Sequence, residues 1–337
     1  MSKILKALFV IIGTLVGAGF ASGQEIYIFF YQYGINGIWG IVVSSTLIAV
    51  VIYKVLDICQ KKEVKNYKDF LKICIKNEKY LEIFNTVINL FILITFYIMV
   101  AGFGAYLEQE LKINGLIGSL LLAVICYIVF LGDVSGLIKI SQWIVPILIG
   151  SLVLIGLNII DVENIFQMYY YLPENESGKW LLDGVLYGSY NTILLIPVVI
   201  ALRNLATNRN KQITISILTG VLVIILSLTI FFMLMKVEVA IENLEMPAVY
   251  IASKISTVFE YIYGFIILSS ILTTSVSLGT SFLENVAKTK KSYKRYAIFI
   301  CVSSIMVSNV GFSNLVNLLY PIFGYIGLVQ ILGILKK

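Results

Sequence analysis

The chain carries a cluster of glycines and polar side chains within its first apolar segment. The stretch GTLVGAGFASGQE, residues 13–25, contains Gly13, Gly17 and Gly19 and ends on Glu25. Glycine lowers the cost of leaving helical dihedrals and leaves no side chain between the backbone and a bound molecule. A helix broken near Gly17–Gly19 would expose carbonyls, which suit a cation, beside free amides, which suit a carboxylate. The segment therefore predicts a site for a polar guest at mid-membrane.

The same residues allow simpler interpretations. Gly13 and Gly17 are four positions apart, which is the spacing of a small-residue stripe for packing between membrane helices. Residues 22–25 fit a capping box, with Ser22 as N-cap and Glu25 reaching back to it. An ionisable group inside a spanning segment is otherwise functional by default, as a proton carrier, a gate residue or a counter-charge to a substrate amine. For Glu25 the capping role and a coupling or gating role can coexist.

Two later apolar segments also contain polar groups. Residues 187–191 read Tyr-Gly-Ser-Tyr-Asn, and residues 269–277 hold six hydroxyl side chains in nine positions. Ser and Thr in membrane helices usually bond to a carbonyl of the preceding turn, which is the simpler role for most of these six. Adjacent hydroxyls with a backbone carbonyl are, however, the neutral oxygen ligands that a hard monovalent cation prefers.

The composition is that of a polytopic membrane protein. Of the 337 residues, 59% are hydrophobic and 13% are charged, and the mean hydropathy is +0.94. A spanning helix needs roughly 20 apolar residues. Apolar runs between charged or turn-forming breaks predict one transmembrane domain of ten spans, at about 4–33, 36–58, 81–107, 113–131, 138–160, 180–202, 213–235, 248–283, 296–311 and 315–335.

Basic residues predict the orientation of these spans. With the N-terminus in the cytoplasm, all but four of the 25 Lys and Arg residues fall on the cytoplasmic side; the four are Lys112, Lys179, Lys236 and Lys254. The positive-inside rule therefore predicts that both termini are cytoplasmic, and the Lys-, Ile- and Asn-rich usage suggests a bacterial cell membrane. A cleavable secretory signal ending near Gly19–Ala21 is the competing interpretation, but its removal would destroy this partition.

The two halves of the chain look alike. Residues 1–160 and 179–337 each supply five spans, each begins with a Gly-interrupted span, and each has a longer loop after its second span. Because five is odd, the second half must enter the membrane upside down. The pattern predicts an all-helical 5+5 inverted repeat with discontinuous first and sixth helices, and interrupted helices at matching positions point to a substrate site.

Several other functions are disfavoured. The chain has no histidine, and its four cysteines form no CxxC pair, which makes metal-assisted or hydrolytic catalysis hard to build. We therefore expect no enzyme and no cofactor apart from a coupling ion. The basic loop at 60–80 also carries acidic residues and borders the membrane, so contact with the inner leaflet is favoured over nucleic acid.

At these motifs the chain resembles the LeuT-fold transporters of the amino acid-polyamine-organocation (APC) superfamily. The opening residues 13–25 look specifically like the YkvI-like bacterial membrane proteins within it. The resemblance covers the whole chain in topology but only short motifs in sequence. Gly13 to Gly19 looks like the unwound first-helix motif, and Leu272 to Ser275 looks like the sodium motif of the eighth helix.

The resemblance implies a set of site residues. In sodium-coupled members, two carbonyls of the first helix, one carbonyl of the eighth and two hydroxyls of the eighth bind the ion. The matching residues here are Gly13, Val16, Ser270, Thr273 and Thr274. Substrate contacts in such proteins lie on the first and sixth helices, and the matching residues are Gly17, Ala18, Gly19, Tyr187, Gly188 and Asn191.

Two departures from the family pattern matter. Phe20 stands where neurotransmitter-type members have an asparagine that completes another sodium site, so no such site is expected. The aromatic-Gly-acid pattern of amino acid exchangers is replaced by residues 187–191, which leaves the substrate open.

The expected function is secondary active transport of a small solute, an amino acid or related zwitterion. Symport with Na⁺ is favoured over H⁺, and alternating access would carry the solute bound between spans 1, 3, 6 and 8. Proton coupling through Glu25 is the competing mechanism. The alternative function is a non-transporting membrane receptor that keeps the pocket as a ligand sensor.

Overall fold

The computed structural model describes residues 3–64, 67–75, 78–132, 135–159, 178–235 and 244–336, and within these ranges the regular structure is helical. The helices of the first half are α1 (Lys3–Leu15), α2 (Ala18–Ser22), α3 (Gln24–Phe29), η1 (Tyr31–Tyr33), α4 (Ile35–Lys61), α5 (Tyr67–Cys74), α6 (Glu78–Leu111), α7 (Gly115–Leu131) and α8 (Ser135–Ile159). Those of the second half are α10 (Lys179–Ala201), η4 (Arg203–Leu205), α11 (Arg209–Leu234), α12 (Pro247–Ile255), α13 (Thr257–Val286), α14 (Lys290–Ser308) and α15 (Phe312–Leu335).

Six helices in the described part of the chain are long and apolar enough to cross a membrane: α4, α6 from Leu81, α10, α11, α13 and α15. α7 and residues 145–157 of α8 are apolar but shorter. Large apolar side chains are exposed on several of these helices, such as Leu157 at 70% and Phe265 at 72%. Such a surface suits a lipid environment. The count of ten spans and the 5+5 repeat stay predictions.

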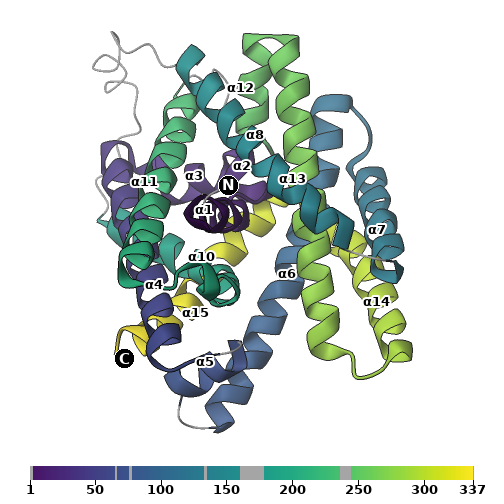
Figure 1. Ribbon diagram of the computed structural model, residues 1–337. Helices are drawn as coiled ribbons and strands as arrows, with labels where there is room; N and C mark the ends of the chain where they lie inside the picture. Colours follow the sequence, from purple (N-terminus) through teal and green to yellow (C-terminus); the bar gives the residue numbers. More distant parts are fainter. Residues whose placement is uncertain are drawn as a thin grey trace.

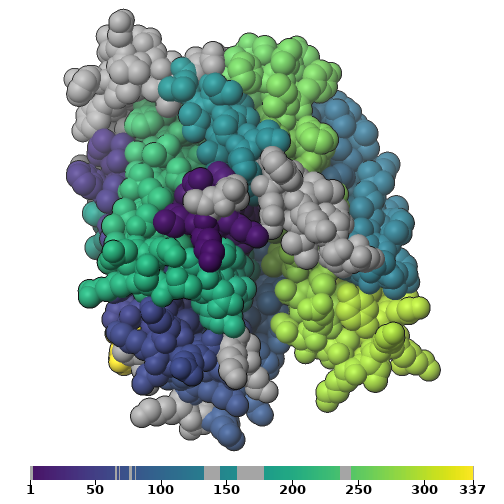
Figure 2. All heavy atoms as spheres, in the orientation of Figure 1, coloured from purple at the N-terminus to yellow at the C-terminus, as the bar shows by residue number. Residues whose placement is uncertain are grey.

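The helices surround α1. α10 packs on α4 and α15, α11 packs on α4 and α1, and α13 packs on α6 and α8, while α7 and α14 pack together and on α6. Figure 1 views α1 along its axis near the centre, whereas α6, α13 and α14 are seen from the side. α1 therefore lies at a steep angle to those helices. In Figure 2 its N-terminal end lies in the middle of the viewed face, beside the green surface of α10 and α11.

Side-chain caps fix several helix starts. Asn114, Asn208 and Ser256 accept hydrogen bonds from backbone amides of the first turn of α7, α11 and α13, respectively, and Thr289 forms a capping box with Ser292 at α14. These residues satisfy amides that a helix leaves unpaired at its N-terminus. The cap at Ser256 divides the predicted span 248–283 into α12 and α13, a boundary that hydropathy does not reveal.

The predicted break in the first span is present. α1 ends at Leu15, Gly17 is extended (φ −87°, ψ −170°), and α2 begins at Ala18. A second break follows at Gly23, whose φ of 87° lies in the left-handed region that favours glycine. The first span therefore consists of α1, two short helices and the turn η1.

The prediction of a discontinuous sixth helix is wrong, because α10 is continuous through residues 187–191. Two of its polar side chains bond within the helix: Ser189 Oγ donates to Val185 O and Asn191 Nδ2 donates to Tyr187 O. Gly188 serves packing, since a Cβ there would lie 3.0 Å from Ser44 O of α4. Close approach of two helices, not an opening of the backbone, therefore accounts for this glycine.

Two predicted features fall outside the described residues. They are the link between the repeats, residues 160–177, and residues 236–243 of the longer loop in the second half. The corresponding loop of the first half contains a further helix, α5.

Candidate substrate and ion site

The break after α1 lies against the hydroxyl-rich part of α13. Ser270 Oγ of α13 donates a hydrogen bond to Val16 O at 3.1 Å. Val16 is the residue that follows the last turn of α1, so its carbonyl has left the regular helix. This bond ties the interrupted first span directly to α13.

Three of the six hydroxyls in residues 269–277 of α13 bond within their own helix, in the way the simpler interpretation expects. Thr273 Oγ1 donates to Ser269 O or Ser270 O, each at 3.0 Å. Ser275 and Ser277 donate to the carbonyls four residues before them. Each of these hydroxyls still has oxygen lone pairs that face outward from the bond.

The residues predicted to hold the cation come together. Gly13, Ser270, Thr273 and Thr274 line one cavity, and Val16 joins them through its bond to Ser270. Their carbonyl and hydroxyl oxygens are neutral, hard donors, which fit Na⁺ better than a transition metal. The residues present therefore fit the predicted ion.

The cavity is large and reaches the surface at the end of the molecule where α6 begins and α13 ends. The sequence next to these helix ends is rich in lysine, so we call it the basic end. The volume of the cavity is about 1110 Å³. The exposed residues Glu82, Asn85, Ser281 and Asn285 line it where α6 begins and α13 ends. Tyr67 of α5 also lines it, and burial raises the pKa of this tyrosine above its ordinary value while Gln330 donates to its hydroxyl. The cavity thus extends from the lysine-rich loops to the break in the first span.

A much smaller cavity of about 20 Å³ lies next to it. Thr14, Leu194 and Thr274 line both cavities and so separate them. The remaining walls of the small cavity are Leu15, Gly17, Glu25, Phe91, Thr95, Met99, Tyr190, Asn191 and Tyr320. Two of the residues predicted to contact substrate, Gly17 and Asn191, therefore line it together with Glu25.

The other predicted substrate residues lie elsewhere. Ala18 and Gly19 are buried within α2, and Tyr187 and Gly188 are buried in α10, but none of the four lines either cavity. Gly19 has a distinct role, because a Cβ added there would overlap the carboxylate of Glu25.

Glu25 does not form the predicted capping box. The N-cap of α3 is Gly23, which has no side chain to cap with, and Ser22 Oγ instead accepts from the backbone amide of Gln24 at 3.3 Å. The correction has a simple cause: the left-handed turn at Gly23 starts α3 one residue later than the capping pattern requires.

The carboxylate of Glu25 is instead surrounded by tyrosines. It accepts a hydrogen bond from the Tyr190 hydroxyl, and the Tyr187 hydroxyl and the Phe20 backbone amide are its other hydrogen-bonding partners. The side chain of Glu25 is 3% exposed. Within the described ranges, none of these partners is a lysine or arginine.

Among the wall residues of this small cavity that sequence reasoning missed are Thr95, Tyr190 and Tyr320. Tyr190 stands inside the quoted stretch 187–191, next to the predicted residue Asn191, and that position was a usable signal. Thr95 and Tyr320 sit in ordinary apolar runs of α6 and α15. Only tertiary packing brings them to Glu25.

The opposite end of the molecule is closed by contacts to the segment before α12. Gln109 of α6 bonds Met246 twice, through Met246 N at 2.9 Å and Met246 O at 3.1 Å. Gln24 Nε2 donates to Leu244 O, and Glu245 Oε2 accepts from Ser313 N at 2.7 Å. These bonds join α3, α6 and α15 across the end remote from the large cavity.

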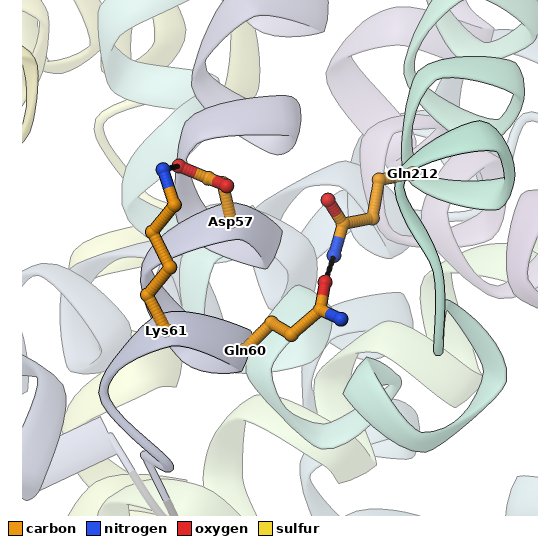
Figure 3. A network of polar contacts seen from close by, with 4 residues as sticks. All are labelled: Asp57, Gln60, Lys61 and Gln212. Carbon is orange, nitrogen blue, oxygen red and sulfur yellow. Dashed lines mark hydrogen bonds and ion pairs between the residues drawn. The ribbon is translucent and has the colours of Figure 1, made fainter.

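A separate polar network lies at the basic end (Figure 3). Gln212 Nε2 of α11 donates to Gln60 Oε1 of α4 at 2.6 Å, and Lys61 pairs with Asp57 one turn earlier on α4 at 2.7 Å. The lysine is well exposed, so the ion pair contributes little stability. This network links α4 to α11 and does not line either cavity.

The fold is similar to those of two solved membrane transporters. A structure of a Na⁺-coupled sialic acid symporter superposes with a TM-score of 0.61 at 14% identity, covering 100% of this chain and 79% of the other. The Eremococcus coleocola manganese transporter superposes with a TM-score of 0.61 at 13% identity, covering 98% and 77%. At these identities the likeness concerns the fold.

Sequence relatives span nearly the whole chain. The uncharacterized membrane protein YkvI of Bacillus subtilis (strain 168) is 28% identical over 332 residues, 98% of this chain and 94% of the relative. YyaD of the same organism is 22% identical over 333 residues, 98% and 96%. No family model matches. The chain is therefore a multi-pass membrane protein that is similar to YkvI.

Proposed function

We propose that the protein is a secondary active transporter of a small solute, an amino acid or related zwitterion, driven by Na⁺. One observation carries this proposal. The interrupted first span meets the hydroxyls of α13 through the Ser270–Val16 bond, at the inner end of a cavity that reaches the surface. Bare peptide groups at membrane depth are tolerated where they line such a cavity.

The arrangement of the two ends supports alternating access. The large cavity reaches the basic end, which the positive-inside rule assigns to the cytoplasm, while the Gln109–Met246 bonds close the other end. A transporter needs a second form in which these bonds part and the inner cavity closes. The structure is then the inward-facing form.

Sodium would act between the first and eighth spans. Its ligands would be the carbonyls of Gly13, Val16 and Ser270 and the hydroxyls of Thr273 and Thr274. An ion held by both helices would draw α1 toward α13 and so favour the form that closes the inner cavity. Differential binding of this kind is what couples the ion gradient to the solute.

The test is uptake of amino acids into proteoliposomes with and without Na⁺. Replacing two hydroxyls by Thr273→Ala with Thr274→Ala should remove the sodium dependence. A matched control, Ser275→Ala with Thr280→Ala, removes two hydroxyls of the same helix that line neither cavity and should keep it. If the first pair leaves sodium dependence intact, the assigned ion site is wrong.

Two outcomes would redirect the proposal. Uptake that follows a proton gradient and is abolished by Glu25→Gln supports proton coupling through Glu25. Ligand-induced thermal stabilisation without any flux supports the receptor alternative.

A further inference from the structure

We propose that the transported solute is recognised by an amine, that Glu25 is the group that binds it, and that a carboxylate on the solute is dispensable. The inference rests on the proposed function, because it takes the small cavity as the collapsed solute site. It extends that function by naming the chemistry of the substrate class: primary amines, with or without an acid group.

Charge in the small cavity has one sign. Among the described residues that line it, Glu25 is the one carboxyl group and none is a lysine or arginine. A carboxylate buried without a cation is costly, and a cationic ligand offsets that cost. The cavity is therefore complementary to a positive group and opposes a negative one.

The amide end of α2 is already used by the protein itself. The Phe20 amide hydrogen-bonds the Glu25 carboxylate, and Gly19 leaves the space that this carboxylate fills. A solute carboxylate placed at the same amides would meet Glu25 at close range, and like charges at close range in a buried site repel strongly. The place expected for the carboxylate of a zwitterionic solute is therefore occupied by the carboxylate of Glu25.

Aromatic rings complete an amine site. Tyr190 and Tyr320 line the cavity with Glu25, and their ring centroids are 4.8 Å apart. Phe29 stacks on Tyr190 with ring centroids 5.8 Å apart. Ring faces attract an ammonium group by cation–π interaction, and the attraction grows when water is excluded.

Access to this site runs through the large cavity. The small cavity has room for about one water molecule, so a solute can enter only after the wall of Thr14, Leu194 and Thr274 parts. Thr14 lies just before the break in the first span, where α1 can swing without unwinding a helix. The merged cavity would bring the amine from the basic end to Glu25.

The test uses the purified full chain and sets of three compounds. The three compounds of a set share the side chain of one amino acid. Each set holds an amino acid, the amine that lacks its carboxylate, and the acid that lacks its amine. At least one set should raise the melting temperature of the protein with the amino acid and the amine but not with the acid. The amine should bind within about tenfold of the amino acid.

Variants assign the effect to Glu25. Glu25→Gln should weaken binding of both amine-bearing compounds by at least about 100-fold, since it removes a buried charge partner. Glu284→Gln, which removes an exposed carboxylate of α13, should leave binding unchanged. Should Glu25→Gln fail to fold, competition on the unaltered protein decides: the amine must displace the labelled amino acid and the acid must not.

Each result has a clear meaning. The proposal is overturned if the acids bind as well as the amino acids, if Glu25→Gln keeps amine binding, or if no compound of any set binds. Amine-selective binding without flux would instead overturn the transport function and leave amine recognition standing. Flux of the acids at the rate of the amino acids would leave transport standing and overturn amine recognition.

Discussion

The glycines of the first span have different structural roles. At Gly17 the backbone is extended, which an alanine also adopts, and a Cβ would meet nothing within 4 Å. Gly19 is helical, but a Cβ there would overlap Glu25. Gly23 needs its positive φ. Only the last of these follows from backbone conformation; Gly19 serves to admit a carboxylate.

Gly19→Ala is therefore expected to push Glu25 off the Phe20 amide. Loss of one hydrogen bond to a charged group is worth about 1.5–3 kcal/mol, so amino acid binding should weaken about tenfold or more. The melting temperature should fall modestly, because a helical alanine recovers up to about 1 kcal/mol over glycine and so offsets part of the lost hydrogen bond. Isothermal titration measures the first effect.

Gly150→Ala in α8 is the control, since a Cβ there meets nothing within 4 Å. This substitution gives the same gain in helix propensity as Gly19→Ala but does not contact Glu25, so it should leave amino acid binding unchanged. Equal binding by Gly19→Ala and the unaltered protein would contradict the role assigned to Gly19.

At the scale of the elements, close packing of α10 on α4 and α15 replaces the predicted break in the sixth span. Gly327 of α15 leaves room for the Ser189 carbonyl of α10, and Gly188 leaves room for Ser44 of α4. Glycines therefore appear on both helix pairs for contact between backbones. This is the small-residue packing that was considered for the first span and holds for the sixth.

Gly327→Ala should destabilise the protein, because the new methyl group would overlap backbone atoms of Ser189 that cannot move independently. Overpacking of this kind costs about 1–3 kcal/mol. Gly333→Ala in the same helix, where a Cβ meets nothing within 4 Å, should keep or raise the melting temperature. Thermal unfolding monitored by size-exclusion fluorescence would compare the two, and equal melting temperatures would contradict the packing role.

The sequence predicted the bounds of the helices better than it predicted which helices pack against each other. Hydropathy places α4, α11 and α15 near their observed bounds, because a membrane span needs a long apolar run whatever its neighbours. The break at Val16–Gly17 was predicted from the glycines and polar groups gathered there, although the glycine spacing also fits a helix-packing stripe. Gly188 gave the same local signal but packs on α4, and nothing within residues 187–191 distinguishes the two uses.

The candidate site could also be predicted only in part. Gly13, Ser270, Thr273 and Thr274 could be grouped from motif resemblance, and the structure brings them to one cavity. Tyr320 and Thr95 could not, because their contact with the small cavity depends on how α15 packs against α3 and how α6 packs against α2. The capping role of Glu25 was likewise open until α3 was seen to begin after Gly23, and its coupling or gating role stays a prediction.

For the whole molecule, the large cavity at one end and the bonded closure at the other fit the inward-facing state of the proposed transport cycle. Gln109 makes two bonds to Met246 across the closed end. At about 0.5–1.5 kcal/mol each, they bias the equilibrium by about 1–3 kcal/mol, which is roughly 5- to 150-fold in population.

This bias can be read from the accessibility of Ser281, which is exposed and lines the large cavity. In a chain with its four cysteines replaced, Ser281→Cys should react with a membrane-impermeant maleimide only from the side of the lysine-rich loops. Adding Gln109→Ala should slow this reaction by up to about twofold, because losing this bias brings the two states toward equal population. Labelling from the opposite side would contradict the predicted orientation.

Gln60→Ala is the matched control, because Gln60 bonds Gln212 and Thr207 at the basic end and takes no part in the closure. It should leave the labelling rate unchanged. A similar slowing by both glutamine variants would indicate a general loss of stability.

Concentrative uptake tests the central claim most directly. Purified protein is reconstituted into liposomes with Na⁺ outside and K⁺ inside, and a labelled amino acid that stabilises the protein is added outside. We predict that the label accumulates above its external concentration and leaves when a sodium ionophore collapses the gradient. An amino acid that binds but never accumulates, under either a sodium or a proton gradient, would contradict the account.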